Sequence, residues 1–104
     1  MDALGGAVGT LAPDATAFPH RKALMTVQYT ATFPDGADPA PYDAYVRGFR
    51  AALVPKWANG AYVNYADASL QDPAKAYFGD NATRLASIRK KYDPRGMFTQ
   101  PQGY

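Results

Sequence analysis

The chain has 104 residues and a formal net charge of +2, so it has room for one domain and lacks the concentrated basic surface of a nucleic-acid-binding protein. Apolar residues make up 47% of the sequence and charged residues 19%, which indicates a globular chain. Cysteine is absent, which excludes disulfides and thiolate chemistry. No stretch approaches the roughly 20 apolar residues of a membrane span. The N-terminal residues lack the features of a signal peptide, and the cellular compartment stays unknown.

The N-terminal third predicts two strands. Residues 4–12, L-G-G-A-V-G-T-L-A, match neither G-x-G-x-x-G nor a Walker pattern, so we expect a glycine-bearing strand. Residues 23–33 alternate with a period of two, which places apolar side chains on one face and Gln28 at the middle of a polar face. That polar face either meets solvent or lines a cleft.

Residues 42–54 predict a helix that ends at Pro55. One face of this helix carries a stripe of aromatic and aliphatic residues, which we expect to pack in the core: Tyr42, Tyr45, Val46, Phe49 and Leu53. Asp43 and Arg47 are spaced as an i, i+4 pair on the outer face.

Asn59-Gly60 predicts a turn into a third strand, G-A-Y-V-N-Y-A-D, over residues 60–67. This run ends in polar side chains and is either part of the core or part of a site. If helix 42–54 crosses between this strand and the strand 23–33, Tyr65 and Gln28 project into one cleft. A phenol has an ordinary pKa near 10, so Tyr65 needs cationic or hydrogen-bonding help to act as a base near neutral pH.

The C-terminal third predicts two helices and an extended tail. Asp72-Pro73 has the pattern of an N-cap and a first helical residue, and Gly79 closes that short helix. A second helix runs from Asp80 until Asp93-Pro94 stops it, with basic residues near its C-terminus that complement the helix dipole. Strands and helices in this order predict an α+β fold with an antiparallel sheet and helices packed on one face.

Two further features have structural interpretations. His20 is the only histidine, and its spacing suggests no acidic or hydroxyl partner, so we expect it to pin the start of a strand. Asn81-Ala82-Thr83 matches a short glycosylation motif, which we attribute to chance. The sequence predicts no metal site.

Four ordered blocks resemble the C-terminal part of the berberine bridge enzyme-like FAD-linked oxidoreductases. They are F-P-H-R-K-A-L-M-T-V-Q-Y (18–29), Y-V-N-Y-A-D (62–67), A-Y-F-G-D-N-A-T-R-L (76–85) and K-K-Y-D-P-R-G-M-F-T-Q-P-Q (90–102). The likeness covers nearly the whole chain. It implies a two-domain flavoprotein of which residues 1–104 form a single partial domain, the substrate domain. Residues 4–58 would supply its last strands and crossing helix, and residues 59–104 the C-terminal berberine bridge enzyme-like segment.

The resemblance also implies roles for individual residues. Tyr65 matches the motif tyrosine that acts as catalytic base, and Gln28 falls on a strand facing the substrate, where relatives have Gln or Glu. Asn64 and Tyr62 match positions near the flavin, although packing is the plainer role for Tyr62, and Asp67 is expected to hold the turn after the strand. The implied reaction is proton abstraction from a small-molecule substrate with hydride transfer to FAD. Gln28 stands where some relatives have Glu, and this favours oxidation of an alcohol or sugar hydroxyl as the reaction over ring closure of a natural product.

The resemblance also implies a missing partner, because the FAD-binding domain lies outside these residues. We therefore expect the chain to bind no FAD and to be inactive alone. The alternative is a non-enzymatic module that associates through the surface that normally faces the flavin domain, where an open sheet edge and an uncovered apolar face invite pairing with another copy. The sequence names neither the substrate nor the electron acceptor.

Overall fold

The computed structural model describes residues 1–104 and combines helices with one two-stranded antiparallel sheet, as an α+β chain does. In chain order the elements are β1 (Asp2–Ala3), η1 (Gly6–Thr10), β2 (Met25–Thr26), α1 (Ala40–Trp57), α2 (Pro73–Phe78), η2 (Gly79–Asn81) and α3 (Ala82–Tyr92), where η denotes a 3-10 helix. None of the helices is both long enough and apolar enough to cross a membrane.

The sheet is much smaller than the sequence predicts. Strands β1 and β2 pair through two residues each, with Asp2 opposite Thr26 and Ala3 opposite Met25. Residues 27–33 were expected to continue the second strand, but they form no backbone ladder. A strand takes its hydrogen bonds from a neighbouring strand, and this chain supplies a neighbour only two residues long.

The strand predicted over residues 4–12 is wrong, because this segment forms the 3-10 helix η1. Gly5 and Gly6 have φ of 143° and 49°, so they turn the chain where a strand would extend it. The hydroxyl of Thr10 then donates to the carbonyl oxygen of Ala7 at 2.8 Å within the helix. The glycines of this segment therefore form a turn and not a strand.

Helix α1 is longer than predicted at its C-terminal end. Asp38 accepts a hydrogen bond from the backbone N–H of Ala40 at 3.0 Å, and the helix continues through Pro55 to Trp57. Proline removes one intrahelical hydrogen bond, and a helix tolerates that loss more readily in its last turn than in its middle. The predicted pair is confirmed, with Arg47 Nε 2.6 Å from Asp43 Oδ2.

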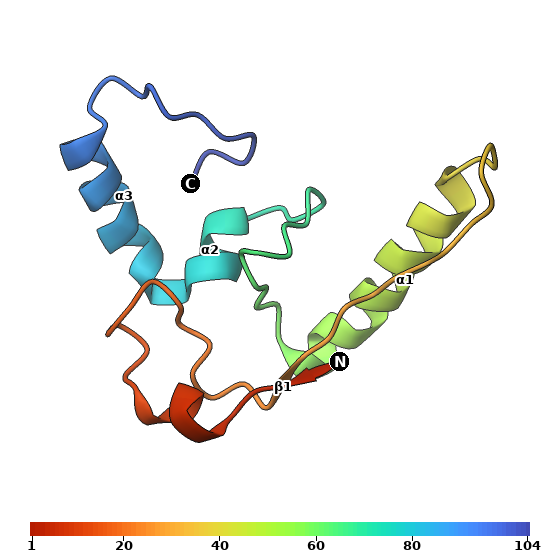
Figure 1. Ribbon diagram of the computed structural model, residues 1–104, viewed down its shortest axis with the longest axis horizontal. Coiled ribbons are helices and arrows are strands. Elements are labelled where there is room, and N and C mark those ends of the chain that lie inside the picture. The colour runs from red at the N-terminus through yellow and green to blue at the C-terminus, as the bar shows by residue number, and fades with distance from the viewer.

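The aromatic side of α1 packs against the extended segment 27–33, which runs alongside the helix in Figure 1. Tyr29 meets Phe49 edge to face with ring centroids 5.3 Å apart, and Phe33 stacks on Tyr42 at 4.9 Å. The predicted stripe is only partly covered, since Tyr45 remains 63% exposed. Helix α1 thus has a partner along one side and an open apolar side.

The helices α2 and α3 begin and end close to where the sequence places them. Asp72 caps α2 by accepting a hydrogen bond from the Lys75 N–H at 3.0 Å, and Gly79 closes it at φ 54°. Helix α3 starts two residues after the predicted Asp80, because η2 occupies the first turn, and it ends before Asp93 as expected.

The molecule is open. Figure 1 shows α1 and α3 diverging from the region of the sheet, with α2 between them. The radius of gyration is 16.0 Å, whereas a compact domain of this length has about 13 Å. The accessible surface is 7895 Å², whereas a folded monomer of this mass exposes about 5,700 Å². Only Ala76 and Tyr77, both in α2, are buried.

Candidate functional site

The predicted site residues of the C-terminal half lie on residues 61–67, which we call the motif loop. The strand predicted here is wrong. The backbone N–H of Tyr65 donates to the carbonyl oxygen of Tyr62 at 2.9 Å, so the chain makes a turn. No neighbouring strand is available to extend it, and the loop lies between α1 and α2 (Figure 1).

The start of the motif loop is fixed at Ala61. Its N–H donates to the carbonyl oxygen of Ala76 in α2 at 2.9 Å, and its own carbonyl oxygen lies 2.9 Å from Nε2 of His20, which donates to it. The His20 ring also packs edge to face on Phe18, whose ring meets Tyr62 in the same way. His20 therefore has a structural role, although it pins a loop and not the start of a strand.

The end of the motif loop is fixed at the backbone of Asp67. Its N–H donates to the hydroxyl of Tyr77 at 2.8 Å. Its carbonyl oxygen accepts from Nε2 of Gln102 at 2.9 Å. Both backbone groups of Asp67 are thus satisfied by side chains of α2 and of the C-terminal tail.

The Asp67 side chain adds two further connections. Its carboxylate accepts hydrogen bonds from the backbone and hydroxyl of Ser69, and Oδ2 lies 3.6 Å from Nε of Arg50 in α1. Partial burial by itself raises the pKa of Asp67, but the Ser69 hydrogen bonds and the charges of Arg50 and Arg47 outweigh it and lower the pKa below its ordinary value. The carboxylate stays charged and holds the turn, as predicted for this residue.

Between these anchors the loop presents its polar side chains to solvent. Asn64 is exposed and donates from Nδ2 to the Tyr62 hydroxyl at 2.8 Å. Tyr65 is 51% exposed and its ring meets that of Tyr62 edge to face. The Tyr65 hydroxyl forms no hydrogen bond within the chain, so any partner for it would come from another molecule or domain.

Gln28 lies on the extended segment beside α1. Its side chain is exposed and forms no hydrogen bond, while its neighbour Tyr29 packs on Phe49. No hydrogen bond or aromatic contact links Gln28 to Tyr65 or to Asn64. A cleft shared by Gln28 and Tyr65 therefore remains a prediction.

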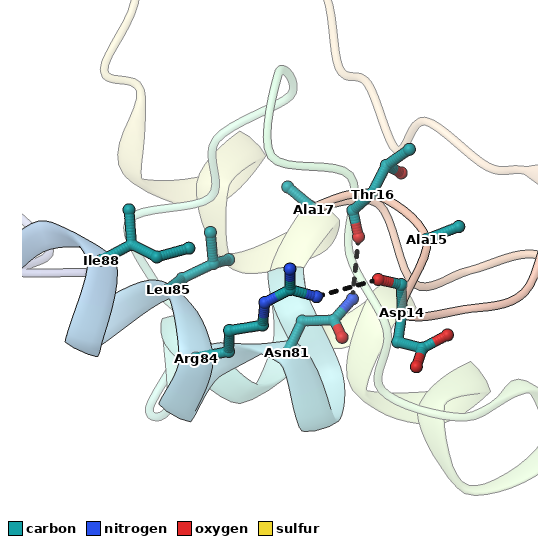
Figure 2. A pocket seen from close by; sticks show the side chains of 8 residues that line it. All are labelled: Asp14, Ala15, Thr16, Ala17, Asn81, Arg84, Leu85 and Ile88. Carbon is teal, nitrogen blue, oxygen red and sulfur yellow. Dashed lines mark hydrogen bonds between the residues drawn. The ribbon is translucent and has the colours of Figure 1, made fainter.

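A hollow between residues 14–17 and helix α3 contains none of the predicted site residues, and Figure 2 shows its lining. Its volume is about 130 Å³, which is below the usual size of a small-molecule site. The side chains of Asn81 and Arg84 point at backbone carbonyls, with Asn81 donating to Thr16 at 3.1 Å and Arg84 to Asp14 at 3.4 Å. These hydrogen bonds join the N-terminal loop to α3, and they use the side-chain amide of Asn81.

Three residues that hold the motif loop were not singled out from the sequence. They are Arg50, Tyr77 and Gln102, which lie on α1, on α2 and in the tail. Gln102 is 35 residues away from its partner Asp67, so no local pattern connects the two. Tyr77 could have been found from the sequence in one way, because an aromatic residue in a short capped helix is a candidate for burial.

Comparison with known proteins supports the resemblance. The berberine and berberine like family matches residues 61–103. The uncharacterized FAD-linked oxidoreductase YgaK of Bacillus subtilis is 34% identical over 94% of this chain and 22% of its own length. The berberine bridge enzyme-like 12 protein of Arabidopsis thaliana is 29% identical over 98% of this chain and 22% of its own. The carbohydrate oxidase of Microdochium nivale is 37% identical over 84% of this chain and 19% of its own.

The chain thus spans about a fifth of the length of these relatives. No solved structure matches it. The family match begins at Ala61, so it contains the whole motif loop, α2, α3 and most of the tail. The resemblance drawn from the four sequence blocks is confirmed, because residues 61–103 match the berberine and berberine like family and nearly the whole chain is similar to part of curated FAD-linked oxidoreductases.

Proposed function

We propose that this chain forms the substrate side of an FAD-dependent oxidoreductase that oxidises a hydroxyl group of a sugar or another small alcohol. The observation that carries the proposal is the motif loop, which is anchored at Ala61 and at Asp67 and presents the unpartnered hydroxyl of Tyr65 outward. A side chain held this way is suited to meet a substrate supplied from outside the chain.

The residues of the chain fit one edge of a flavin site. Asn64 and Tyr65 are exposed together on the loop, and Asn64 offers an amide that can hydrogen-bond to a polar ring. Asn64 and Tyr62 would border FAD held by a flavin-binding domain.

FAD, when bound, would supply the hydride acceptor for the reaction. Tyr65, as its phenolate, would take the proton of the substrate hydroxyl, so that the alcohol is oxidised to a carbonyl compound. Gln28 would orient the substrate by hydrogen bonding, because its amide both donates and accepts but cannot ionise. The preference for a sugar hydroxyl is supported by the name of the carbohydrate oxidase relative.

The large accessible surface of the chain supports the proposal that it packs against a further domain. Its accessible area exceeds by about 2,200 Å² the area expected for a folded monomer of this mass. An excess of this size is what a chain leaves open when it packs against further protein, and the relatives are about five times longer. We infer that the flavin-binding domain covers part of this area.

The test is reconstitution. The purified chain is expected to show no flavin absorbance, and after addition of a flavin-binding domain it should consume oxygen in the presence of oligosaccharides or simple alcohols. If the reconstituted protein binds FAD but oxidises none of these substrates, the proposed activity is wrong. If the chain alone retains FAD, the assignment of the cofactor to a separate domain is wrong.

A non-enzymatic module that associates through the open surface is the second candidate. It is supported by the exposed aromatic side of α1, where Tyr45 and Trp57 are 63% and 53% exposed. Light scattering separates the two cases. A stable self-associated form without flavin affinity supports the module, whereas a chain that associates only with a flavin-binding domain supports the enzyme.

A further inference from the structure

The most buried side chain of the molecule, Tyr77, carries a polar group. Tyr77 is 1% exposed, and a buried phenol hydroxyl needs hydrogen-bond partners. It has two, since it accepts from the N–H of Asp67 at 2.8 Å and donates to Oε1 of Gln102 at 3.1 Å. Neither partner belongs to helix α2, so the hydroxyl joins three separate segments.

Gln102 closes this arrangement into a cycle. Its amide nitrogen donates to the carbonyl oxygen of Asp67 at 2.9 Å while its amide oxygen accepts from Tyr77. One donor and one acceptor of the Asp67 backbone are therefore met by two side chains, in the way that a neighbouring strand would meet them. This explains how a run with a strand-like sequence is held without a sheet.

The cycle lies two residues after Tyr65. The other end of the loop is fixed at Ala61, and residues 64–66 between the anchors are exposed. The Tyr65 ring contacts only Tyr62 among the aromatic residues, so its position depends on where the loop ends are held. We propose that Tyr77 and Gln102 are positioning residues for Tyr65, an inference that rests on the proposed function.

The tail that carries Gln102 is itself secured. The ring of Tyr104 packs edge to face on Tyr77 at 5.1 Å and on Phe78 at 5.2 Å. Arg89 of α3 donates to the carbonyl oxygens of Tyr104 and Phe98 at 2.6 and 2.9 Å. Gln102 is thus held at the loop by a structured tail, and α2, α3 and the tail act together on the loop end.

The structure offers a matched control for the test. Tyr77→Phe removes the hydroxyl from the cycle and keeps the ring. Tyr104→Phe removes a hydroxyl that forms no hydrogen bond, from a ring that packs on the same helix. Gln102→Glu keeps the acceptor for Tyr77 but loses the donor to Asp67, and it lies in the tail, where it spares the packing of α2.

The first measurement is amide hydrogen exchange by NMR in the full 104-residue chain. Tyr77→Phe and Gln102→Glu are expected to speed exchange at the amides of Asp67 and Tyr65 by about tenfold, because a hydrogen bond to the loop end is lost. Exchange within α3 should not change, and Tyr104→Phe should match the original chain. Unchanged exchange at the loop amides, or an equal effect of Tyr104→Phe, overturns the proposal.

The second measurement uses the chain reconstituted with FAD and its flavin-binding domain. Displacing a reacting group by about 1 Å can cost about a hundredfold in rate. Tyr77→Phe and Gln102→Glu are therefore expected to lower kcat by tenfold or more with KM changed less than threefold. A normal kcat despite a loosened loop overturns the positioning role. If the unmodified protein turns over no substrate, the proposed function fails, and the exchange experiment still decides whether this pair holds the loop.

Discussion

Arg50 of α1 and Asp67 of the motif loop form an ion pair that ties the long helix to the loop, with Nε 3.6 Å from Oδ2 and side chains 23% and 31% exposed. Arg50 also donates from Nη2 to the side-chain oxygen of Asn59 at 2.8 Å. This arginine therefore fixes both the end of α1 and the far end of the loop. It is the one ion pair that connects α1 with the C-terminal half of the chain.

Replacing this arginine should loosen the loop. Arg50→Met removes the positive charge beside Asp67, so the pKa of the Asp67 carboxyl should rise toward its ordinary value, and the free energy of unfolding should fall by about 1 kcal/mol or less. An NMR titration of Asp67 and urea unfolding measure the two effects. Arg47→Met is the control, because Arg47 pairs with the exposed Asp43. A larger pKa change in the control would contradict the assignment.

The turn after α3 should be sensitive to acid. Asp93 accepts hydrogen bonds from the backbone N–H groups of Phe98 and Met97 at 2.9 and 2.8 Å, and these bonds lower its pKa. A lowered pKa in the folded state means that the contribution is present above the unfolded pKa of about 3.9 and is lost as the pH falls through the folded pKa. The amides of Met97 and Phe98 should therefore lose protection from exchange below about pH 4.

Asp93→Asn tests this assignment. An asparagine has one acceptor oxygen where the carboxylate has two, so the two amides should exchange faster at neutral pH and show no acid transition. Asp35→Asn is the control, since Asp35 forms no hydrogen bond or ion pair. An acid transition that persists in Asp93→Asn would assign it to another group.

The features that the sequence predicted well depend on local interactions. The Asp72 cap, the glycine that closes α2 and the end of α3 before Asp93 all involve residues within one helical turn of each other. The same holds for the Asp43 and Arg47 pair. For these features the spacing of the residues in the sequence is enough to predict their contacts in the structure.

The features that the sequence missed depend on distant partners. The motif loop has a strand-like composition, but whether such a run becomes a strand depends on a neighbour. Here the groups that satisfy Asp67 come from Tyr77 and Gln102, which are 10 and 35 residues away. Residues 27–33 likewise keep the alternation of a strand and pack on α1, yet nothing in the chain pairs with them. Their polar face, with Gln28, is open to a partner.

The C-terminal end of α1 has a residue in an unfavourable conformation. Ala58 has φ 70° and ψ 168°, a region occupied almost only by glycine, and such residues cost of order 1–3 kcal/mol. Ala58→Gly should raise the free energy of unfolding by about 1 kcal/mol, after allowance for the greater freedom of glycine in the unfolded chain. Urea unfolding measures the change.

Ala44→Gly is the matched control for that experiment. Ala44 lies within α1 and is exposed, so the same substitution there should lower the free energy of unfolding by about 1 kcal/mol. Opposite signs at the two positions show that the effect at Ala58 comes from its backbone angles. Destabilisation at both positions would contradict this explanation.

The proposed catalytic base is the most direct test of the site. Tyr65→Phe removes the exposed hydroxyl and keeps the ring that packs on Tyr62. In the flavin-reconstituted protein kcat should fall by about a hundredfold or more, because a positioned base contributes about 10²–10⁴ to the rate. KM should change little.

A second tyrosine separates the loss of the proposed base from the loss of any exposed hydroxyl. Tyr92→Phe is the control, because Tyr92 is 75% exposed on α3 and its hydroxyl forms no hydrogen bond. A Tyr65→Phe protein that keeps its kcat, or a Tyr92→Phe protein that loses as much, would remove Tyr65 from the chemistry.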